Sequence, residues 1–112
     1  MSPGPLLALG AACIAAGVAQ AQVTPQRQQQ LVHLVRQDCG ACHGLQLTGG
    51  LGPPLTARAL SDRTLDSIVA TTLHGRPGTP MPAWTSMLSE ADARWIAQQL
   101  RAGFPDEPKG RR

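Results

Sequence analysis

Two cysteines and a histidine stand together at residues 39–43, where the chain reads Cys-Gly-Ala-Cys-His. Two intervening residues place both sulfurs on one helical turn, at the separation of the two vinyl groups of a haem. The thiols of Cys39 and Cys42 can add across those vinyl groups as thioethers, and the imidazole of His43 can reach the iron from the same face. The pattern therefore predicts one haem c, attached through Cys39 and Cys42 with His43 as an iron ligand.

Paired cysteines also occur in two other kinds of site. A thiol-disulfide redox motif belongs in a βαβ context, but no segment here alternates with period two for long enough to indicate a strand. Half of a zinc site would need a second C-x-x-C or an H-x-x-x-H, and neither follows the motif. Haem attachment is the interpretation that agrees with the rest of the chain.

A haem iron that binds one histidine has a second axial position, which Met81, Met87, His33 or His74 could fill. Met81 stands between two prolines, which restrict the unfolded loop and would hold a weak thioether ligand in place. Met87 fits packing before a helix, His74 fits a solvated position at a helix C-terminus, and His33 fits a surface site. We expect Met81 to be the sixth ligand.

Ligation by His43 and Met81 would raise the reduction potential relative to ligation by two imidazoles. It would also leave no open position on the iron for a substrate. These properties are typical of an electron carrier rather than an enzyme. A histidine ligand usually donates its other N–H to a carbonyl, and the Gly-Pro pair at residues 52–53 could place the Pro53 carbonyl at that nitrogen. An ordinary turn is the alternative interpretation of this pair.

Helical periodicity indicates an all-α domain. Helices are expected from Pro25 to about Asp38 after an N-cap at Thr24, from Ser61 or Asp62 to His74, and from Ser89 to Gly103. The connections are rich in glycine and proline, which excludes helix and central strand there. The expected apolar faces comprise Leu31, Val32, Leu34 and Val35; Leu65, Ile68, Val69, Thr72 and Leu73; and Ala91, Trp95, Ile96, Gln99 and Leu100.

The amino-terminal segment predicts export. An apolar run from Leu6 to Ala19 is followed by Ala19-Gln20-Ala21, which fits the cleavage pattern of a secretory signal. We expect a signal peptide at 1–21, a domain at 22–104 and a disordered tail at 105–112, with the mature protein in the periplasm. Cys13 lies within the predicted signal peptide. No apolar segment suited to stable membrane insertion would remain after cleavage.

The composition favours a domain completed by a cofactor. About ninety residues remain after the predicted cleavage, and the chain has one Phe, two Trp and no Tyr. Cys39 and Cys42 are too close together to brace a fold as a disulfide, whereas a large apolar cofactor would supply interior. The formal charge is +3, and no run of Lys and Arg is interleaved with aromatic residues, so nucleic-acid binding is not indicated.

The order of these features resembles class I cytochromes c over essentially the whole mature chain. That order is helix, C-x-x-C-H, Gly-Pro-x-Leu, helix, methionine loop and a last helix with an aromatic residue. The resemblance implies three main helices wrapped around a covalently attached haem. It also implies that the first and last helices cross, with Trp95 at the crossing.

Residues 38–45, 49–53 and 75–84 resemble, more narrowly, the small periplasmic cytochromes c-55X. Those proteins are encoded with the cd1-type nitrite reductase of denitrifying bacteria. The decapeptide Gly-Arg-Pro-Gly-Thr-Pro-Met-Pro-Ala-Trp at 75–84 is the most specific part. The resemblance implies a monomer that passes electrons from an upstream donor to this nitrite reductase, or that takes part in maturing its d1 haem. A small peroxidase or thiol oxidoreductase is a third alternative.

Overall fold

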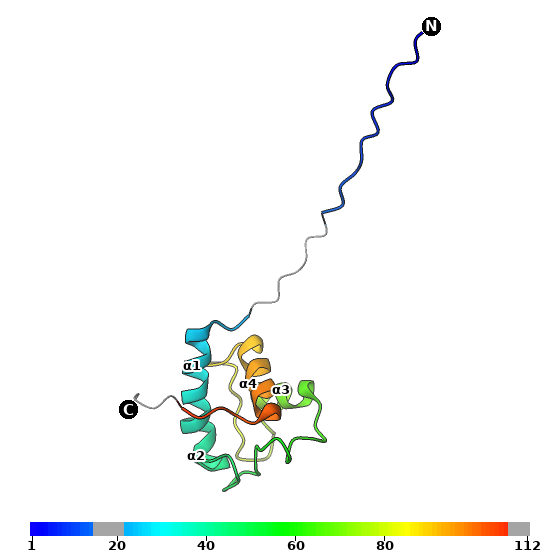
Figure 1. Cartoon of the computed structure of the whole chain (residues 1–112). Coiled ribbons are helices and arrows are strands. Elements are labelled where there is room, and N and C mark those ends of the chain that lie inside the picture. Colours follow the sequence, from blue (N-terminus) through cyan, green and yellow to red (C-terminus); the bar gives the residue numbers. More distant parts are fainter. Residues whose placement is uncertain (15–21, 108–112) are drawn as a thin grey trace.

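Four α-helices and one π-helical segment make up the ordered body of the computed structural model, which describes residues 1–14 and 22–107 (Figure 1). No strand occurs within those ranges, so the predicted all-α class is confirmed for them. Residues 1–14 are exposed and have no regular secondary structure, and the predicted cleavage site at 19–21 lies outside the described residues. None of the described helices combines the length and the apolar character needed to cross a bilayer. In chain order the elements are α1 (Pro25–Leu34), the π-helix η1 (Val35–Cys39), α2 (Gly40–His43), α3 (Leu65–His74) and α4 (Glu90–Ala102).

The first helical segment, which comprises α1, η1 and α2, starts where the sequence predicts but extends beyond the predicted end. The Thr24 side chain accepts a hydrogen bond from the backbone N–H of Arg27 at 3.2 Å, and a proline occupies the first turn. Instead of ending near Asp38, the chain stays helical through α2, with η1 in between. In η1 the backbone N–H of Gly40 donates to the carbonyl of Val35, five residues earlier. A π turn adds a residue to the spiral, so the residues that follow are rotated relative to the apolar face of α1.

The helix α3 begins later than expected, at Leu65 rather than at Ser61 or Asp62. The reason is a local cap, because the Thr64 side chain accepts from the N–H of Ser67 at 3.1 Å. Residues 57–63 form turns instead.

The start of α4 agrees with the sequence. Ser89 and Asp92 form a capping box, in which each side chain accepts a hydrogen bond from the backbone N–H of the other residue, at 3.0 and 3.1 Å. Gly103 ends the helix with a φ of 93°, a conformation that favours glycine.

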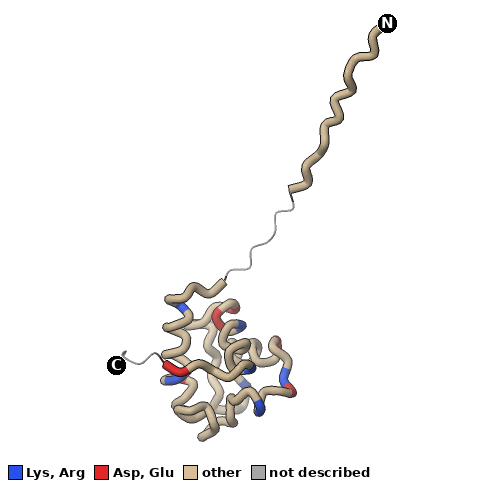
Figure 2. The backbone as a smooth tube through the Cα atoms, viewed as in Figure 1, with Lys and Arg blue, Asp and Glu red and all other residues tan. Residues whose placement is uncertain are grey.

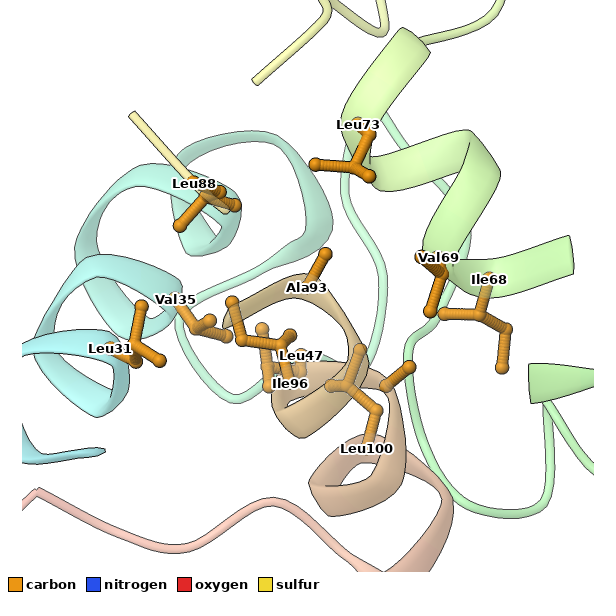
Figure 3. Packing of buried hydrophobic residues seen from close by; sticks show 11 residues of the cluster. Leu31, Val35, Leu47, Ile68, Val69, Leu73, Leu88, Ala93, Ile96 and Leu100 are labelled. Atoms are coloured by element: carbon orange, nitrogen blue, oxygen red, sulfur yellow. The ribbon is translucent and has the colours of Figure 1, made fainter. Parts of the chain in front are cut away.

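The core lies between the first helical segment, α3 and α4. Figure 3 shows Leu31 and Val35 on one side and Ile96 and Leu100 of α4 on the other, with Leu47 next to Ile96. Two alanines of α4, Ala93 and Ala97, are fully buried, and side chains this small let neighbouring segments approach closely. Trp95 is only half-buried, so it lies at the margin of the core, where its ring meets that of Phe104 edge to face at 6.4 Å. The α3 contribution to the core consists of Ile68, Val69 and Leu73.

Leu47 fastens the loop after α2 to this core. Its side chain is 2% exposed, although its backbone has a φ of 59°, a left-handed conformation that is uncommon for leucine. Two backbone hydrogen bonds hold it there: its N–H donates to Gly44, and its carbonyl accepts from Leu55, both at 2.8 Å. Burial of the side chain offsets a backbone cost of about 1–2 kcal/mol.

An ion pair joins the start of α1 to the start of α4. The Arg27 guanidinium donates to the two carboxylate oxygens of Asp92 at 2.9 and 3.4 Å and to the Met87 carbonyl at 3.1 Å. Burial by itself would raise the pKa of the Asp92 carboxyl, but the hydrogen bonds from Arg27 and Ser89 and the charge of Arg27 outweigh it and lower this pKa. The carboxylate thus serves both the helix cap and the contact between the two helices.

The chain after α4 returns to the first helical segment. The Arg36 guanidinium donates to the carbonyls of Phe104 and Pro105 at 3.0 and 2.9 Å and lies 5.4 Å from the centre of the Phe104 ring. His33 and Glu107 approach to 2.6 Å. Residues 105–107 of the predicted disordered tail are therefore held against the domain, and residues 108–112 lie outside the described residues.

We predict that Asp92→Ala lowers the free energy of unfolding by about 2 kcal/mol, because it removes the Asp92 half of the capping box and leaves a half-buried Arg27 without its partner. Because the pKa of Asp92 is lowered by folding, its contribution is present above the unfolded pKa and is lost as the pH falls through the folded value. Urea unfolding at neutral and strongly acidic pH should show that the difference between wild type and variant shrinks in acid.

Asp66→Ala is the matched control for this ion pair. Asp66 also pairs with an arginine, Arg94, at 3.0 Å, but its side chain is exposed. The free energy of unfolding of Asp66→Ala should be lower than that of wild type by about 0.5 kcal/mol or less at every pH. Equal losses from the two variants would contradict the role given to Asp92.

Candidate functional site

The attachment motif forms one helical turn at the end of the first helical segment. Cys39 ends η1, whereas Cys42 and His43 lie in α2. Cys39 and Cys42 are not joined to each other by a disulfide; Cys39 is half-buried against the core and Cys42 is exposed. The arrangement offers two thiols and an imidazole to a single ligand that rests on this turn.

The electrostatics of Cys39 do not suit thiol redox catalysis. Burial, and to a smaller extent the charges of Asp38 and Cys42, raise the pKa of the Cys39 thiol to about 11. A redox-active C-x-x-C motif needs a cysteine whose pKa is lowered so that a thiolate forms near neutral pH. The described residues also contain no group of three or more His, Cys, Asp or Glu side chains arranged to hold a metal ion.

The imidazole of His43 is oriented by the loop that follows the motif. Its Nδ1–H donates to the Pro53 carbonyl, at a distance of 2.7 Å. The sequence predicts this hydrogen bond from the Gly-Pro pair, and the structure contains it. With the proton on Nδ1, the other ring nitrogen, Nε2, carries the lone pair that a metal requires.

Gly52 brings the loop close to the imidazole ring. A Cβ atom at this position would lie 2.7 Å from Cε1 and 2.8 Å from Nδ1 of His43, closer than non-bonded atoms approach. The backbone N–H of Gly52 also donates to the carbonyl of Cys42 at 2.8 Å. The absence of a side chain at residue 52 is therefore what allows the loop to pack on the ring.

The loop that carries Met81 is closed by its own hydrogen bonds. The Met81 carbonyl accepts from the N–H of Arg76 at 3.2 Å, and the Thr79 hydroxyl accepts from the N–H of Met81 at 3.3 Å. Gly75 has a φ of 68°, and a Cβ there would lie 2.6 Å from the Met81 carbonyl oxygen. Met81 itself is half-buried. These contacts restrain the methionine, as the flanking prolines lead us to expect.

The other three candidates for the sixth ligand have different surroundings. His33 is exposed and contacts Glu107, and His74 is exposed at the end of α3. Met87 is 53% exposed, so it does not pack in the core as the sequence suggests. Its carbonyl, rather than its sulfur, makes the contact with Arg27 described above.

The donor set and the surface around it fit a haem. Two cysteine sulfurs one turn apart, and an imidazole whose Nδ1 is already hydrogen-bonded, match the attachment chemistry. Leu45 and Leu51, both in the loop after the motif, are strongly exposed, so this part of the surface is apolar enough to lie beside a porphyrin.

Comparison with known proteins agrees with this chemistry. A family model described as cytochrome c oxidase, cbb3-type, subunit III matches residues 26–99. A protein named cytochrome c55X from Pseudomonas aeruginosa is 55% identical over 97 residues, which cover 87% of this chain and 82% of that protein. A cytochrome c55X from Paracoccus denitrificans is 58% identical over 74 residues, covering 66% of this chain and 72% of the relative.

The chain belongs to the cytochrome c55X family of class I c-type cytochromes. Members of this class carry covalently bound haem c, and the cysteine pair Cys39 and Cys42 supplies the attachment in this chain. The solved structure of a c-type cytochrome named NirC superposes with a TM-score of 0.71 at 56% identity, covering 71% of this chain and 94% of that one. The predicted cytochrome c fold and the electron-carrier function are thereby confirmed.

A more distant c55X-like segment occurs within a longer protein. The dihydro-haem d1 dehydrogenase of Pseudomonas aeruginosa is 38% identical over 76 residues, which make up 68% of this chain but 15% of that protein. The structure of the dehydrogenase NirN superposes with a TM-score of 0.57 at 34% identity and covers 71% of this chain and 16% of that one. This chain therefore corresponds to a small part of the dehydrogenase.

Gly52 and Leu47 were not singled out by sequence reasoning. Gly52 was visible only as part of a turn, because a steric contact with His43 requires knowing where the ring lies. Leu47 is one of several leucines in a loop, and no periodicity distinguishes it. The π turn of η1 is equally hidden, since its residues read as ordinary helix.

We predict that Gly52→Ala displaces the His43 ring and weakens its hydrogen bond to Pro53, because the new methyl group would occupy the ring's position. The hyperfine-shifted resonances of His43 and the midpoint potential should both change relative to wild type. Gly103→Ala is the control, since it costs about 1 kcal/mol of backbone strain at a site where nothing lies within 4 Å. Unchanged His43 resonances in Gly52→Ala would contradict the contact.

Proposed function

We propose that this cytochrome is a periplasmic one-electron carrier in which His43 and Met81 are the two axial ligands of the haem iron. When bound, haem c cycles between its ferric and ferrous states and so accepts or gives one electron at a time. The observation that supports this function best is the hydrogen bond from His43 to Pro53, which leaves Nε2 as the free nitrogen. Pro53 therefore acts on the cofactor site through its carbonyl group.

Met81 suits the second axial position because its loop is restrained by its own hydrogen bonds. The hydrogen bonds among Arg76, Thr79 and Met81 reduce the freedom that a weak thioether ligand would otherwise lose. A thioether raises the potential relative to a second imidazole and closes the coordination sphere. Both effects favour electron transfer over substrate turnover, in keeping with a carrier that is not an enzyme.

The partner we propose is a cd1-type nitrite reductase of denitrification, with a separate redox protein as the upstream donor. Support comes from the family match to cytochromes c55X and from the 75–84 decapeptide around Met81. Residues 1–21 would direct the protein to the periplasm as a signal peptide, and residues 22–104 would form the monomeric cytochrome domain around its haem.

A second candidate function is an accessory role in making haem d1. The segment shared with the dihydro-haem d1 dehydrogenase favours it, because a c-type domain of this kind occurs in a protein named for d1 chemistry. In that role the chain would take electrons from, or give them to, the maturation machinery rather than the finished reductase.

We predict that Met81→Ala lowers the midpoint potential by on the order of 0.1 V, within the roughly 0.8 V range that axial ligands span. The sulfur-to-iron charge-transfer band of the ferric protein should disappear in the same variant. Met87→Ala is the matched control, because Met87 is exposed and its contact with Arg27 uses the backbone carbonyl. Retention of the band in Met81→Ala would remove Met81 as the ligand.

Deleting the gene should separate the two candidate functions. If the protein is a shuttle, the reductase should keep a normal d1 haem content while electron delivery to nitrite slows. Purified reduced cytochrome should then restore the rate when added to the isolated reductase. A reductase depleted of d1 haem would favour the maturation role and contradict the shuttle.

A further inference from the structure

Gln22 is the residue at which the proposed mature protein begins. The apolar run and the Ala19-Gln20-Ala21 pattern predict cleavage after Ala21, so Gln22 would carry the free α-amine. A glutamine in this position has a reaction open to it that internal glutamines lack. Its side-chain amide lies within reach of its own α-amine, and the two can close a five-membered lactam.

The structure anchors the chain immediately after Gln22. The side chain of Val23 is half-buried against the core, and the Val23 carbonyl accepts a hydrogen bond from the Gln28 side-chain amide at 3.2 Å. Thr24 then caps α1. Gln22 itself is exposed and precedes this anchored stretch, so its side chain can turn back on its own nitrogen without disturbing the domain.

The start of α1 does not favour an added positive charge. The N-terminal end of a helix carries the positive end of its dipole, and α1 has no acidic residue in its first turn. From residue 22 onward the tube in Figure 2 is tan until it reaches Arg27, which is itself basic. A charged α-amine on Gln22 would therefore lie next to like charge rather than beside a carboxylate of the same helix.

Gln22 also lines a shallow pocket between the start of α1 and α4, together with Trp95, Arg94 and Glu90. Glu90 is the acidic residue of this pocket, and its carboxylate already lies 3.8 Å from the Arg94 guanidinium. An ammonium group on Gln22 would compete with Arg94 for that carboxylate. A neutral ring next to the half-buried Trp95 needs no counterion.

We propose that Gln22 of the mature protein is converted to pyroglutamate. The α-amine nitrogen attacks Cδ of the side-chain amide, a new C–N bond closes the ring, and the old C–N bond breaks. The amide nitrogen leaves as ammonia with the proton that the attacking amine loses, so no oxidant, reductant or co-reactant is required. A fraction of any α-amine is neutral at pH 7 and can act as this nucleophile.

The modification would give the exported protein a neutral, blocked amino terminus. Aminopeptidases require a free α-amine, so the lactam would protect the anchored residues at the start of α1 from trimming. The proposal rests on the signal peptide proposed above, and it is independent of the redox partner.

Mass spectrometry of the haem-loaded protein, purified after export, tests the proposal. Free amines are first dimethylated with formaldehyde on the intact protein, which tags an uncyclised Gln22 and prevents later ring closure. Trypsin cleavage after Arg27 then releases the peptide 22–27. We expect this peptide to carry no label and to be lighter than the unmodified sequence by one ammonia in most of the molecules.

The same digest contains its own control. Trypsin cleavage after Arg27 and Arg36 also releases the peptide 28–36, which begins with Gln28 but has no free α-amine until digestion. Loss of ammonia from the peptide 28–36 therefore measures ring closure during the work-up, and it should be much less complete than in 22–27.

Gln22→Glu is the matched variant. It preserves the length of the side chain, but a carboxylate is a poor electrophile, so the peptide 22–27 of this variant should be labelled almost completely. The start of α1 lies at the opposite end of the first helical segment from the attachment motif (Figure 1), so the visible spectrum of this variant should match wild type.

Three results would overturn the proposal. A wild-type peptide 22–27 with a labelled amine would exclude ring closure while leaving the cleavage site in place. An unlabelled peptide of any mass other than that of the lactam would show a different modification. A mature protein that begins at another residue would overturn the modification together with the proposed cleavage site. Each of these results leaves the electron-carrier function untouched, because the visible spectrum reports the haem separately.

Discussion

The imidazole of His43 can serve an iron only if its ring is oriented with Nε2 free, and the 2.7 Å hydrogen bond to the Pro53 carbonyl provides that orientation. The rest of the site depends on this contact. Gly52 permits the loop to approach the ring, and its own N–H ties the loop back to Cys42. The thiols, the imidazole and the loop therefore form one connected unit.

The scaffold supports this unit with a modest interior. The first helical segment and α4 meet over leucines and buried alanines, and Arg27 and Asp92 join their starting turns. Leu47 has an unfavourable backbone conformation, and its buried side chain joins the loop after α2 to the same core. A small domain with few aromatic residues gains much from a large apolar cofactor, because the cofactor adds buried surface that the chain lacks.

The sequence alone predicted the features that depend on residues close together in the chain. The Thr24 cap, the capping box of Ser89 and Asp92, and the contact between His43 and Pro53 all follow from residue types at fixed short spacings. The later start of α3 was missed because Ser61, Asp62 and Thr64 can all cap a helix, and propensity alone does not tell which of them does so. The π turn and the steric role of Gly52 depend on three-dimensional packing, which one sequence does not display. The contacts of Arg36 and His33 with residues 104–107 also depend on tertiary structure, so the sequence alone did not predict them.

The central claim is that a haem is bound covalently through Cys39 and Cys42, beside a correctly oriented His43. Trypsin cleavage after Arg36 and Arg58 releases one peptide, residues 37–58, that contains all three side chains. Mass spectrometry of this peptide from purified protein tests the claim most directly. The account predicts a peptide mass increased by one haem, with neither cysteine open to alkylation. A peptide without added mass, in which both thiols alkylate, would contradict it.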